Sequence, residues 1–253
     1  MAAALLEAKA VAKHFGGVKA LRDVSLSIRQ GEIYGLIGPN GAGKTTFFNC
    51  MTGLYIPDGG GFVFDGAPLK ADAPHRAAER GIARTFQNIR LFANMTALEN
   101  VMVGRHVRTA AGVLGAMFQN RTTRAEEAAI RQRAEDLLHY VRIEDRADDL
   151  AKNLSYGDQR RLEIARALAT EPKLLCLDEP AAGMNATETE ELRDLIDGIR
   201  RDGTTILLIE HDVKLVMGLC DRVAVLDYGA LVIEDVPAVV QKDQRVIEAY
   251  LGA

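Results

Sequence analysis

Residues 38–46 include the glycines, lysine and hydroxyls that are needed to bind a phosphate group. The stretch fits the pattern G-x-x-x-x-G-K-[ST], in which glycines let successive backbone N–H groups turn inward and form an anion-binding nest. A helix that begins near Gly43 would add its positive end, Lys44 would reach the β- and γ-phosphates, and the Thr45 hydroxyl would ligate Mg²⁺.

A glycine-rich turn before a helix is the alternative interpretation of this stretch. The surrounding sequence favours a nucleotide site, because residues 32–37 read as a buried strand and residues 46–51 as a helix. The residues that we expect to contact the nucleotide are Gly38, Pro39, Asn40, Gly41, Ala42, Gly43, Lys44, Thr45 and Thr46.

Two further predicted strands end in side chains that suit phosphate chemistry. The apolar residues 174–177 lead into Asp178 and Glu179. Asp178 could help to hold Mg²⁺, and Glu179 could act as general base on a water. A strand that simply ends at an acidic turn is the alternative. His211 follows the strand pattern of residues 204–209, at the strand end where open α/β sheets place their ligands.

Three other positions are weaker candidates. Gln87 ends a predicted core strand and could reach Mg²⁺ or the attacking water, although most glutamines are surface residues. Ser155 or Asp158 could cap the helix that follows, and this helix start beside Gly157 is a second potential phosphate site. Phe15 lies in a predicted turn and could either pack in the core or stack on a base.

The composition excludes several classes of function. The chain has 253 residues, of which 48% are hydrophobic and 26% charged, which suits one large domain or a domain with an inserted lobe. The formal charge of −4 gives no overall basic surface for nucleic acid. We interpret the adjacent arginines as solvated helix faces; they are Arg160 with Arg161 and Arg200 with Arg201.

The cysteines and the apolar runs indicate where the chain acts. Three cysteines lie far apart in apolar surroundings, which predicts buried thiols and a reducing compartment rather than disulfides or a metal site. They are Cys50, Cys176 and Cys220. Residues 1–10 lack the features of a signal peptide, and no run approaches the roughly 18 apolar residues of a membrane span. We therefore expect any membrane role to depend on partners.

Strand and helix patterns alternate along the chain and predict an α/β fold. Residues 88–153 differ because their patterns are helical, so we interpret them as an insertion. Within it, residues 124–141 have an apolar stripe at helical spacing. The stripe consists of Ala128, Ile130, Ala134, Leu137, Leu138 and Val141.

In their order along the chain, these motifs resemble those of the ATP-binding subunits of ABC transporters. The match includes the P-loop (38–45), Gln87 as the Q-loop, residues 154–159 as the signature motif and residues 174–178 as Walker B. The signature reads Leu-Ser-Tyr-Gly-Asp-Gln, so Tyr156 and Asp158 depart from the usual LSGGQ. Asn185 stands where the family's D-loop usually has aspartate.

The resemblance implies a role for each candidate. The catalytic residues would be Lys44, Gln87, Glu179 as the catalytic glutamate and His211 as the switch histidine. The Mg²⁺ ligands would be Thr45, Gln87 and Asp178, while Phe15 would stack on adenine. Ser155 and Gly157 would bind the ATP held by a partner subunit.

Shorter motifs are similar to the LivG type of subunit, which serves branched-chain amino acid importers. They are residues 15–17, 84–87, 90–92, 179–183, 209–212 and 249–252, together with a long 104–124 stretch. The implied fold is a P-loop NTPase core, a mixed sheet with helices, plus an antiparallel β subdomain and the helical lobe. Residues 1–253 would form one ATP-binding domain, with 1–87 and 154–253 as core and β subdomain and 88–153 as helical subdomain.

The resemblance also implies partners. ATP would close a head-to-tail dimer, either a homodimer or a heterodimer with a LivF-like ATPase subunit, and hydrolysis would reopen it. Two membrane permease subunits and a substrate-binding protein would complete an importer on the cytoplasmic face of the inner membrane, without nucleic acid. Leu91, Phe92 and Met95 could contact a permease helix or pack on the helical lobe.

Other classes of protein fit less well. An ABC ATPase of DNA repair or translation usually has two ATPase halves or a long coiled coil, and this chain has one P-loop and no sustained heptads. A non-catalytic nucleotide-binding regulator has no need of Lys44, Glu179 and His211, which are all present. Transporters of urea, short-chain amides or lipopolysaccharide remain alternatives, because the substrate does not contact this subunit.

Overall fold

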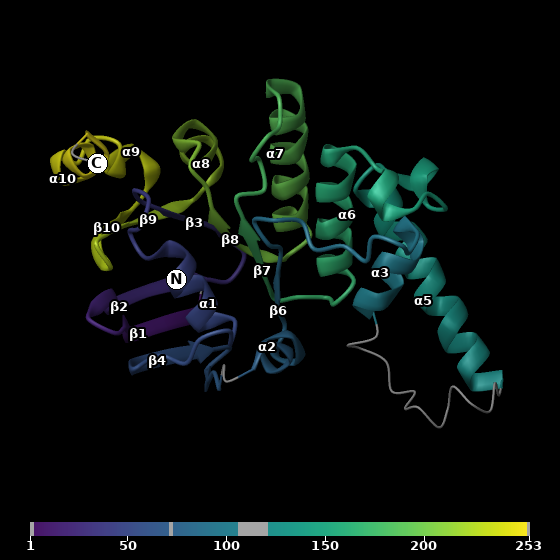
Figure 1. Cartoon of the computed structure of the whole chain (residues 1–253), viewed down its shortest axis with the longest axis horizontal. Coiled ribbons are helices and arrows are strands. Elements are labelled where there is room, and N and C mark those ends of the chain that lie inside the picture. Colours follow the sequence, from purple (N-terminus) through teal and green to yellow (C-terminus); the bar gives the residue numbers. More distant parts are fainter. Residues whose placement is uncertain (1–2, 71–72, 106–120, 252–253) are drawn as a thin grey trace. The chain divides into compact units, whose positions relative to one another are not determined.

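The computed structural model describes residues 3–70, 73–105 and 121–251 (Figure 1). The chain forms two compact units, one made of residues 1–84 with 173–253 and the other of residues 85–172. The second unit begins close to the predicted helical insertion but extends past residue 153 to include the signature motif and the helix after it. Much of the predicted 104–124 stretch lies outside the described residues.

A six-stranded mixed sheet forms the centre of the first unit. Its order is β10 (Ala230–Asp235), β9 (Arg222–Asp227), β3 (Ile33–Ile37), β8 (Thr205–Ile209), β7 (Leu174–Asp178) and β6 (Ile82–Arg84). Neighbouring strands are parallel except for β10, which pairs antiparallel with β9. Every residue of β3, β7 and β8 is buried, as expected for parallel strands that are covered on both faces. The predicted mixed sheet is confirmed.

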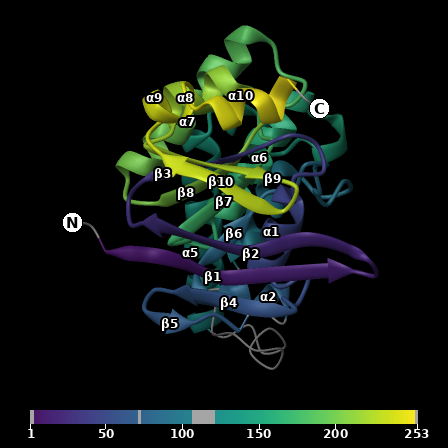
Figure 2. The ribbon, with the colours of Figure 1, turned by 90° about the vertical axis from the view of Figure 1, so that its left-hand side faces the viewer.

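The first unit also contains the predicted antiparallel sheet (Figure 2). Its strands are β2 (Val18–Arg29), β1 (Ala4–Phe15), β4 (Gly59–Phe64) and β5 (Ala67–Pro68), in that order. In β2, Val24, Leu26 and Ile28 are buried, whereas Ser25 between them is exposed. This alternation places one face of the strand on the core and the other toward solvent.

Helices complete the first unit. They are α1 (Lys44–Met51), α2 (Pro74–Arg80), α7 (Ala186–Arg201), α8 (Val213–Leu219), α9 (Pro237–Val240) and α10 (Gln244–Leu251). Helix α1 packs into the hydrophobic core of this unit through Phe47 and Phe48, which are fully buried together with residues of both sheets. The C-terminal tail contains two of these helices, α9 and α10. All three cysteines are buried and free, as predicted.

The second unit is helical. It contains α3 (Ala97–Arg105), α5 (Arg121–Tyr140), α6 (Tyr156–Leu168) and two short 3₁₀ turns (Glu144–Arg146 and Ala151–Asn153). The apolar stripe is buried at Ile130, Ala134, Leu137 and Leu138 of α5 and at Val141 just after the helix, whereas Ala128 is exposed at the end of the stripe. Helix α3 approaches α6 closely at Gly104, where a Cβ would lie 2.3 Å from the Arg166 carbonyl oxygen. Among the described residues, no helix is both long and apolar enough to cross a membrane.

Candidate nucleotide-binding site

The P-loop joins the buried strand β3 to helix α1, and its glycines are required by the backbone. Gly38 has φ 149°, and a Cβ there would lie 2.1 Å from the carbonyl oxygen of Leu226. Gly43 has φ 103°, and a Cβ there would lie 2.6 Å from the carbonyl oxygen of Ala20. Side chains are therefore excluded at both positions, and the loop is confined by the neighbouring strands.

Lys44 is a buried cation inside this loop. Its side chain donates hydrogen bonds to the carbonyl oxygens of Gly38 (2.6 Å) and Pro39 (3.0 Å). Burial lowers the pKa of Lys44, whereas the nearby carboxylates of Glu179 and Asp178 act in the opposite direction. Helix α1 has no side-chain cap at its N-terminus, so the first N–H groups of the helix point into a site that suits an anion.

Asp178, Glu179 and His211 come together at the carboxyl ends of β7 and β8. The Glu179 N–H donates to the carbonyl oxygen of Ile209 (2.8 Å), which ties the two strand ends together. His211 Nε2 lies 2.5 Å from Glu179 Oε1. Glu179 has φ 49°, a conformation uncommon for residues with side chains. The predicted trio therefore forms one cluster, in the same unit as the P-loop.

The donor atoms in this unit suit Mg²⁺. Thr45 supplies a hydroxyl in the first turn of α1, and Asp178 supplies a carboxylate on a side chain that is only 5% exposed. Hydroxyl and carboxylate oxygens are the hard ligands that Mg²⁺ prefers, with waters completing its coordination. The side chains present thus fit the ion that the sequence predicts.

Phe15 lies at the end of β1 and is 44% exposed as a residue, so it is not a core residue. The Tyr55 ring meets it edge-on, with 5.2 Å between the ring centroids. Lys13 Nζ lies 5.5 Å from the Phe15 centroid and donates to Asp58 Oδ1 (3.0 Å). The ring is therefore supported at its edge and remains exposed, as a base-stacking surface requires.

The remaining candidates belong to the second unit. Ser155 is the N-cap of α6, because its hydroxyl oxygen accepts a hydrogen bond from the Asp158 N–H (3.2 Å). Ser155 and Tyr156 are exposed and Gly157 is partly exposed, so this helix start is open to a ligand. The Gln87 residue is exposed as well. The P-loop, Asp178, Glu179 and His211 lie in the first unit, while Gln87, Ser155 and Gly157 lie in the second.

Comparison with known proteins identifies the family. The sequence profile described as "ABC transporter" matches residues 21–182, more than half of the chain. The chain belongs to the ABC transporter family. It is an ATP-binding cassette ATPase, and the fold and ordered motifs described above are those of this family.

Individual relatives of this ABC ATPase cover its whole length. The branched-chain amino acid transport ATP-binding protein LivG of Salmonella typhimurium is 44% identical over 253 residues, covering 100% of this chain and 99% of LivG. The lipopolysaccharide export ATP-binding protein LptB of Escherichia coli is 34% identical and covers 98% of each chain.

Solved structures agree with the family assignment. The ADP conformation of an ATP-binding cassette of an ABC transporter has a TM-score of 0.86 and 31% identity, and covers 99% of this chain and 100% of that one. A dimeric post-hydrolysis cassette bound to ADP and Pi has a TM-score of 0.77 and 27% identity, and covers 92% of this chain and 98% of that one. The predicted cassette fold is confirmed.

Asn185, at the end of the D-loop of this ABC ATPase, is the N-cap of helix α7. The Asn185 side chain accepts from the Glu188 N–H (3.0 Å), and the Glu188 carboxylate accepts from the Asn185 N–H (2.9 Å). Asparagine and aspartate cap helices about equally well. The departure from the family pattern therefore preserves the cap at the start of α7.

Sequence reasoning missed an ion pair in the second unit. The interpretation of Arg160 as solvated is wrong, because its side chain is 0% exposed and pairs with Glu163 at 2.9 Å. Arg160 also donates to the carbonyl oxygens of Phe86 (2.7 Å) and Gln87 (2.9 Å). Burial raises the pKa of Glu163, while Arg160 acts against that rise. The only signal in the sequence is an arginine and a glutamate three apart in an otherwise apolar helix face.

Glu210 is a second residue that the sequence indicated only as part of a motif. It is 4% exposed, and its carboxylate accepts hydrogen bonds from the N–H groups of Ala181 (2.7 Å) and His211 (3.1 Å). Burial raises the pKa of Glu210, and these N–H groups lower it. Glu210 thus connects the backbone of the D-loop to that of the switch histidine.

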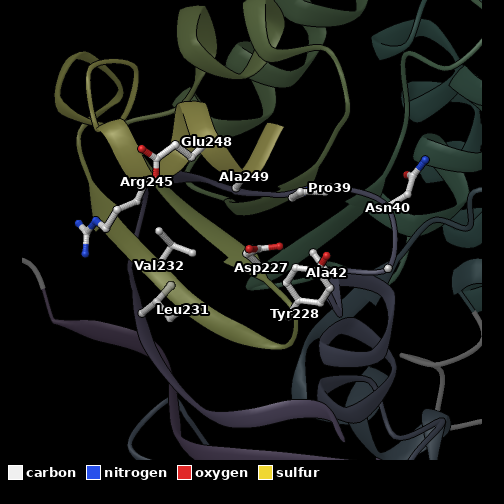
Figure 3. Close-up of a pocket in the computed structure, with 11 residues that line it drawn as sticks. Pro39, Asn40, Ala42, Asp227, Tyr228, Leu231, Val232, Arg245, Glu248 and Ala249 are labelled. Carbon is white, nitrogen blue, oxygen red and sulfur yellow. The ribbon is translucent and has the colours of Figure 1, made fainter. Parts of the chain in front are cut away.

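A cavity of about 620 Å³ lies on another side of the P-loop (Figure 3). Residues 39–42 form one wall, and the β9–β10 hairpin with α10 forms the rest, including Tyr228 and Arg245. Neither Lys44 nor Asp178 is one of the described residues that line this cavity. The hairpin contacts the loop directly, since the Gly229 N–H donates to the Ala42 carbonyl oxygen (3.0 Å). The cavity is therefore separate from the cluster of Lys44 and the acidic residues.

Proposed function

We propose that this chain is the ATP-hydrolysing subunit of an importer of branched-chain amino acids. The observation that carries the proposal is the 44% identity to LivG over the full length of both proteins. The 34% identity to LptB gives weaker support to lipopolysaccharide export. In this proposal residues 1–253 form a single ATP-binding domain, with residues 88–153 as its helical subdomain.

The P-loop and Lys44 bind the phosphates of ATP. The backbone N–H groups of the loop, which Pro39 alone in residues 38–46 lacks, surround the anion, and Phe15 stacks on the adenine. The Lys44 ammonium exchanges the carbonyl oxygens of Gly38 and Pro39 for phosphate oxygens. This exchange recovers the cost of burying the cation, because a phosphate is a charged acceptor and a carbonyl is not.

Mg²⁺ would be held by Thr45 and Asp178, with Gln87 as a further ligand. The ion supplies charge neutralisation for the transferred phosphoryl group. Glu179 accepts the proton of the attacking water, and His211 contacts the γ-phosphate. The close approach of His211 Nε2 to Glu179 Oε1 supports these roles, because it orients the carboxylate at the strand ends.

A second subunit completes the site. The open, capped start of α6 at Ser155 and Gly157 suits the ATP bound by the partner, and a related cassette has been solved as a dimer with ADP and Pi. We propose a head-to-tail dimer, with itself or with a LivF-like subunit, on the cytoplasmic face of the inner membrane. Two permeases and a binding protein complete the importer, and the exposed Phe92 and Met95 contact a permease helix.

Reconstitution tests the transported substrate. The chain is co-expressed with the permeases and ATPase subunit that co-purify with it, and ATP hydrolysis in membranes is measured with the cognate binding protein. Leucine, isoleucine or valine should stimulate hydrolysis, and urea and short-chain amides should not. Stimulation by urea alone, or co-purification with lipopolysaccharide export components, would contradict the proposal.

Two point substitutions test the hydrolysis of ATP and the ATP-dependent dimer. Glu179→Gln should retain ATP binding and hydrolyse ATP at least ~10²-fold more slowly, the usual contribution of a general base. The Ser155→Arg variant should bind ATP, but its subunits should fail to dimerise when ATP is added. Near-normal turnover in the first variant would contradict the role of Glu179, and ATP-driven dimerisation of the second would contradict the role of the signature motif.

A further inference from the structure

Arg84, the last residue of β6, makes contacts that no motif predicts. Its side chain is 9% exposed, and Nη2 lies 3.2 Å from Asp178 Oδ2. Nη1 donates to Asn49 Oδ1 (2.8 Å) and Thr52 Oγ1 (2.9 Å), both of which belong to α1 or its C-terminal cap. The guanidinium carbon lies 4.5 Å from the centre of the Phe48 ring.

These contacts join the two elements that carry the proposed metal ligands. Helix α1 carries Thr45 in its first turn, and β7 ends at Asp178. One nitrogen of Arg84 is bound to the helix and the other to the carboxylate. Because the guanidinium is planar and its five N–H groups are rigidly arranged, it restrains both the spacing of the two elements and the orientation of the carboxylate.

We propose that Arg84 is a positioning residue for the metal site, which holds the Asp178 carboxylate in the orientation that Mg²⁺ with ATP requires. The inference rests on the proposed role of Asp178 as a metal ligand. In the contacts described, Arg84 acts on the metal site through Asp178 and α1. Residues that orient a ligating carboxylate typically change metal affinity by about 10–100-fold when they are removed.

Arg222 offers a matched control for burial and charge. It also pairs with carboxylates, Glu234 at 2.5 Å and Glu32 at 3.4 Å, and its side chain is 15% exposed. Its guanidinium lies 5.5 Å from the Tyr34 ring. Arg222 begins β9, which runs parallel to β3, so it lies at the edge of the sheet opposite to the P-loop. Its removal disturbs the fold in a similar way without touching Asp178.

The decisive quantity is the ratio between the Kd for ATP in EDTA and the Kd for ATP with Mg²⁺. A purely structural role would change both constants together and leave this ratio unaltered. Arg84→Met should lower the ratio about tenfold and weaken Mn²⁺ binding to the ATP complex, measured by electron paramagnetic resonance, to the same extent. Arg222→Met should leave the ratio within about twofold of wild type at a matched folded fraction.

Two more variants separate the possible failures. Asp178→Asn must lower the ratio if Asp178 is a metal ligand, and an unchanged ratio would contradict that assignment. A lower ratio in Asp178→Asn but an unchanged or higher one in folded Arg84→Met would overturn the positioning role alone. If Arg84→Met does not fold, Arg84→Lys takes its place, because lysine keeps the charge but cannot reach both partners. It should lower the ratio by about threefold, and a wild-type ratio would overturn the proposal.

Discussion

Each compact unit contains an arginine with little or no exposed side chain, which pairs with a carboxylate and lies over an aromatic ring. In the first unit Arg84 pairs with Asp178 and lies over Phe48. In the second unit Arg160 pairs with Glu163, and its guanidinium carbon lies 5.7 Å from the centre of the Tyr156 ring. The two pairs look alike, but their other hydrogen-bond partners differ.

Apart from their carboxylates, the described acceptors of Arg84 are side chains, whereas those of Arg160 include backbone. For Arg84 they are the Asn49 amide and the Thr52 hydroxyl, and for Arg160 one of them is the Tyr156 hydroxyl (3.0 Å). Arg160 donates to the main-chain carbonyls of the Q-loop, and its partner Glu163 accepts from two main-chain N–H groups there, at 3.2 and 3.4 Å. Side chains can rotate when a partner is lost, but backbone groups in a packed loop must be satisfied where they are.

This difference separates function from stability. Loss of Arg84 should chiefly disorient Asp178, while loss of Arg160 should release the Q-loop backbone and weaken the second unit. Arg84 belongs to the first unit, whereas Arg160 and the Phe86 carbonyl that it binds belong to the second. We therefore expect the loss of each arginine to act within its own unit. Three substitutions test this difference, each with a direction and a size.

Arg160→Met should have the largest effect on stability. It leaves Glu163 buried without its partner, which typically costs about 3–5 kcal/mol, and it leaves two carbonyls without their donor. Urea unfolding measures the loss. Arg161→Met, on the same helix, should cost about 1 kcal/mol or less, because Arg161 is partly exposed and its described bond, to the Val141 carbonyl, is long at 3.3 Å. Equal losses in the two variants would remove the contrast.

Glu163→Gln should have an intermediate effect. Glutamine keeps the size of the side chain but loses the charge, so its bonds to Arg160 and to the Q-loop N–H groups weaken, at a cost of about 1–3 kcal/mol. Hydrogen exchange should accelerate at Phe86 and Arg90 before it does so in β7. Unchanged protection at these two amides would mean that Glu163 does not hold the loop.

Thr52→Val should have the smallest effect. It removes one of the acceptors of Arg84 and a bond to the Phe48 carbonyl, at a cost of about 1 kcal/mol. The Mg²⁺-dependent gain in ATP affinity should fall by about twofold. Thr189→Val is the control, since its hydroxyl bonds the Asn185 carbonyl in the same manner but contacts no arginine in the contacts described. An equal fall of the Mg²⁺-dependent gain in both variants would mean that the bond between Thr52 and Arg84 does not affect metal binding.

The sequence predicted those site residues that are neighbours along the chain or that directly follow a strand pattern. The P-loop residues are neighbours in sequence, and Asp178, Glu179 and His211 each follow an apolar strand, so parallel pairing brings them to one edge of the sheet. Arg84 and Arg160 gave no such signal. Asp178 lies 94 residues from Arg84, and the Gln87 carbonyl lies 73 residues from Arg160, whose nearby Glu163 reads like a surface pair because a charged residue in a sequence is ordinarily a surface residue.

The amino-acid pattern is sufficient for the cassette fold, the P-loop and the acidic cluster, because local periodicity and strand ends specify them. It left open whether Phe15 is exposed and whether Ser155 or Asp158 caps α6; the structure leaves Phe15 exposed at the end of β1 and makes Ser155 the cap. Only the folded chain decides which charges are buried, since burial depends on what packs against a side chain from distant segments. For that reason Arg84 becomes a partner of Asp178, and Arg160, expected on the surface, becomes the buried support of the Q-loop.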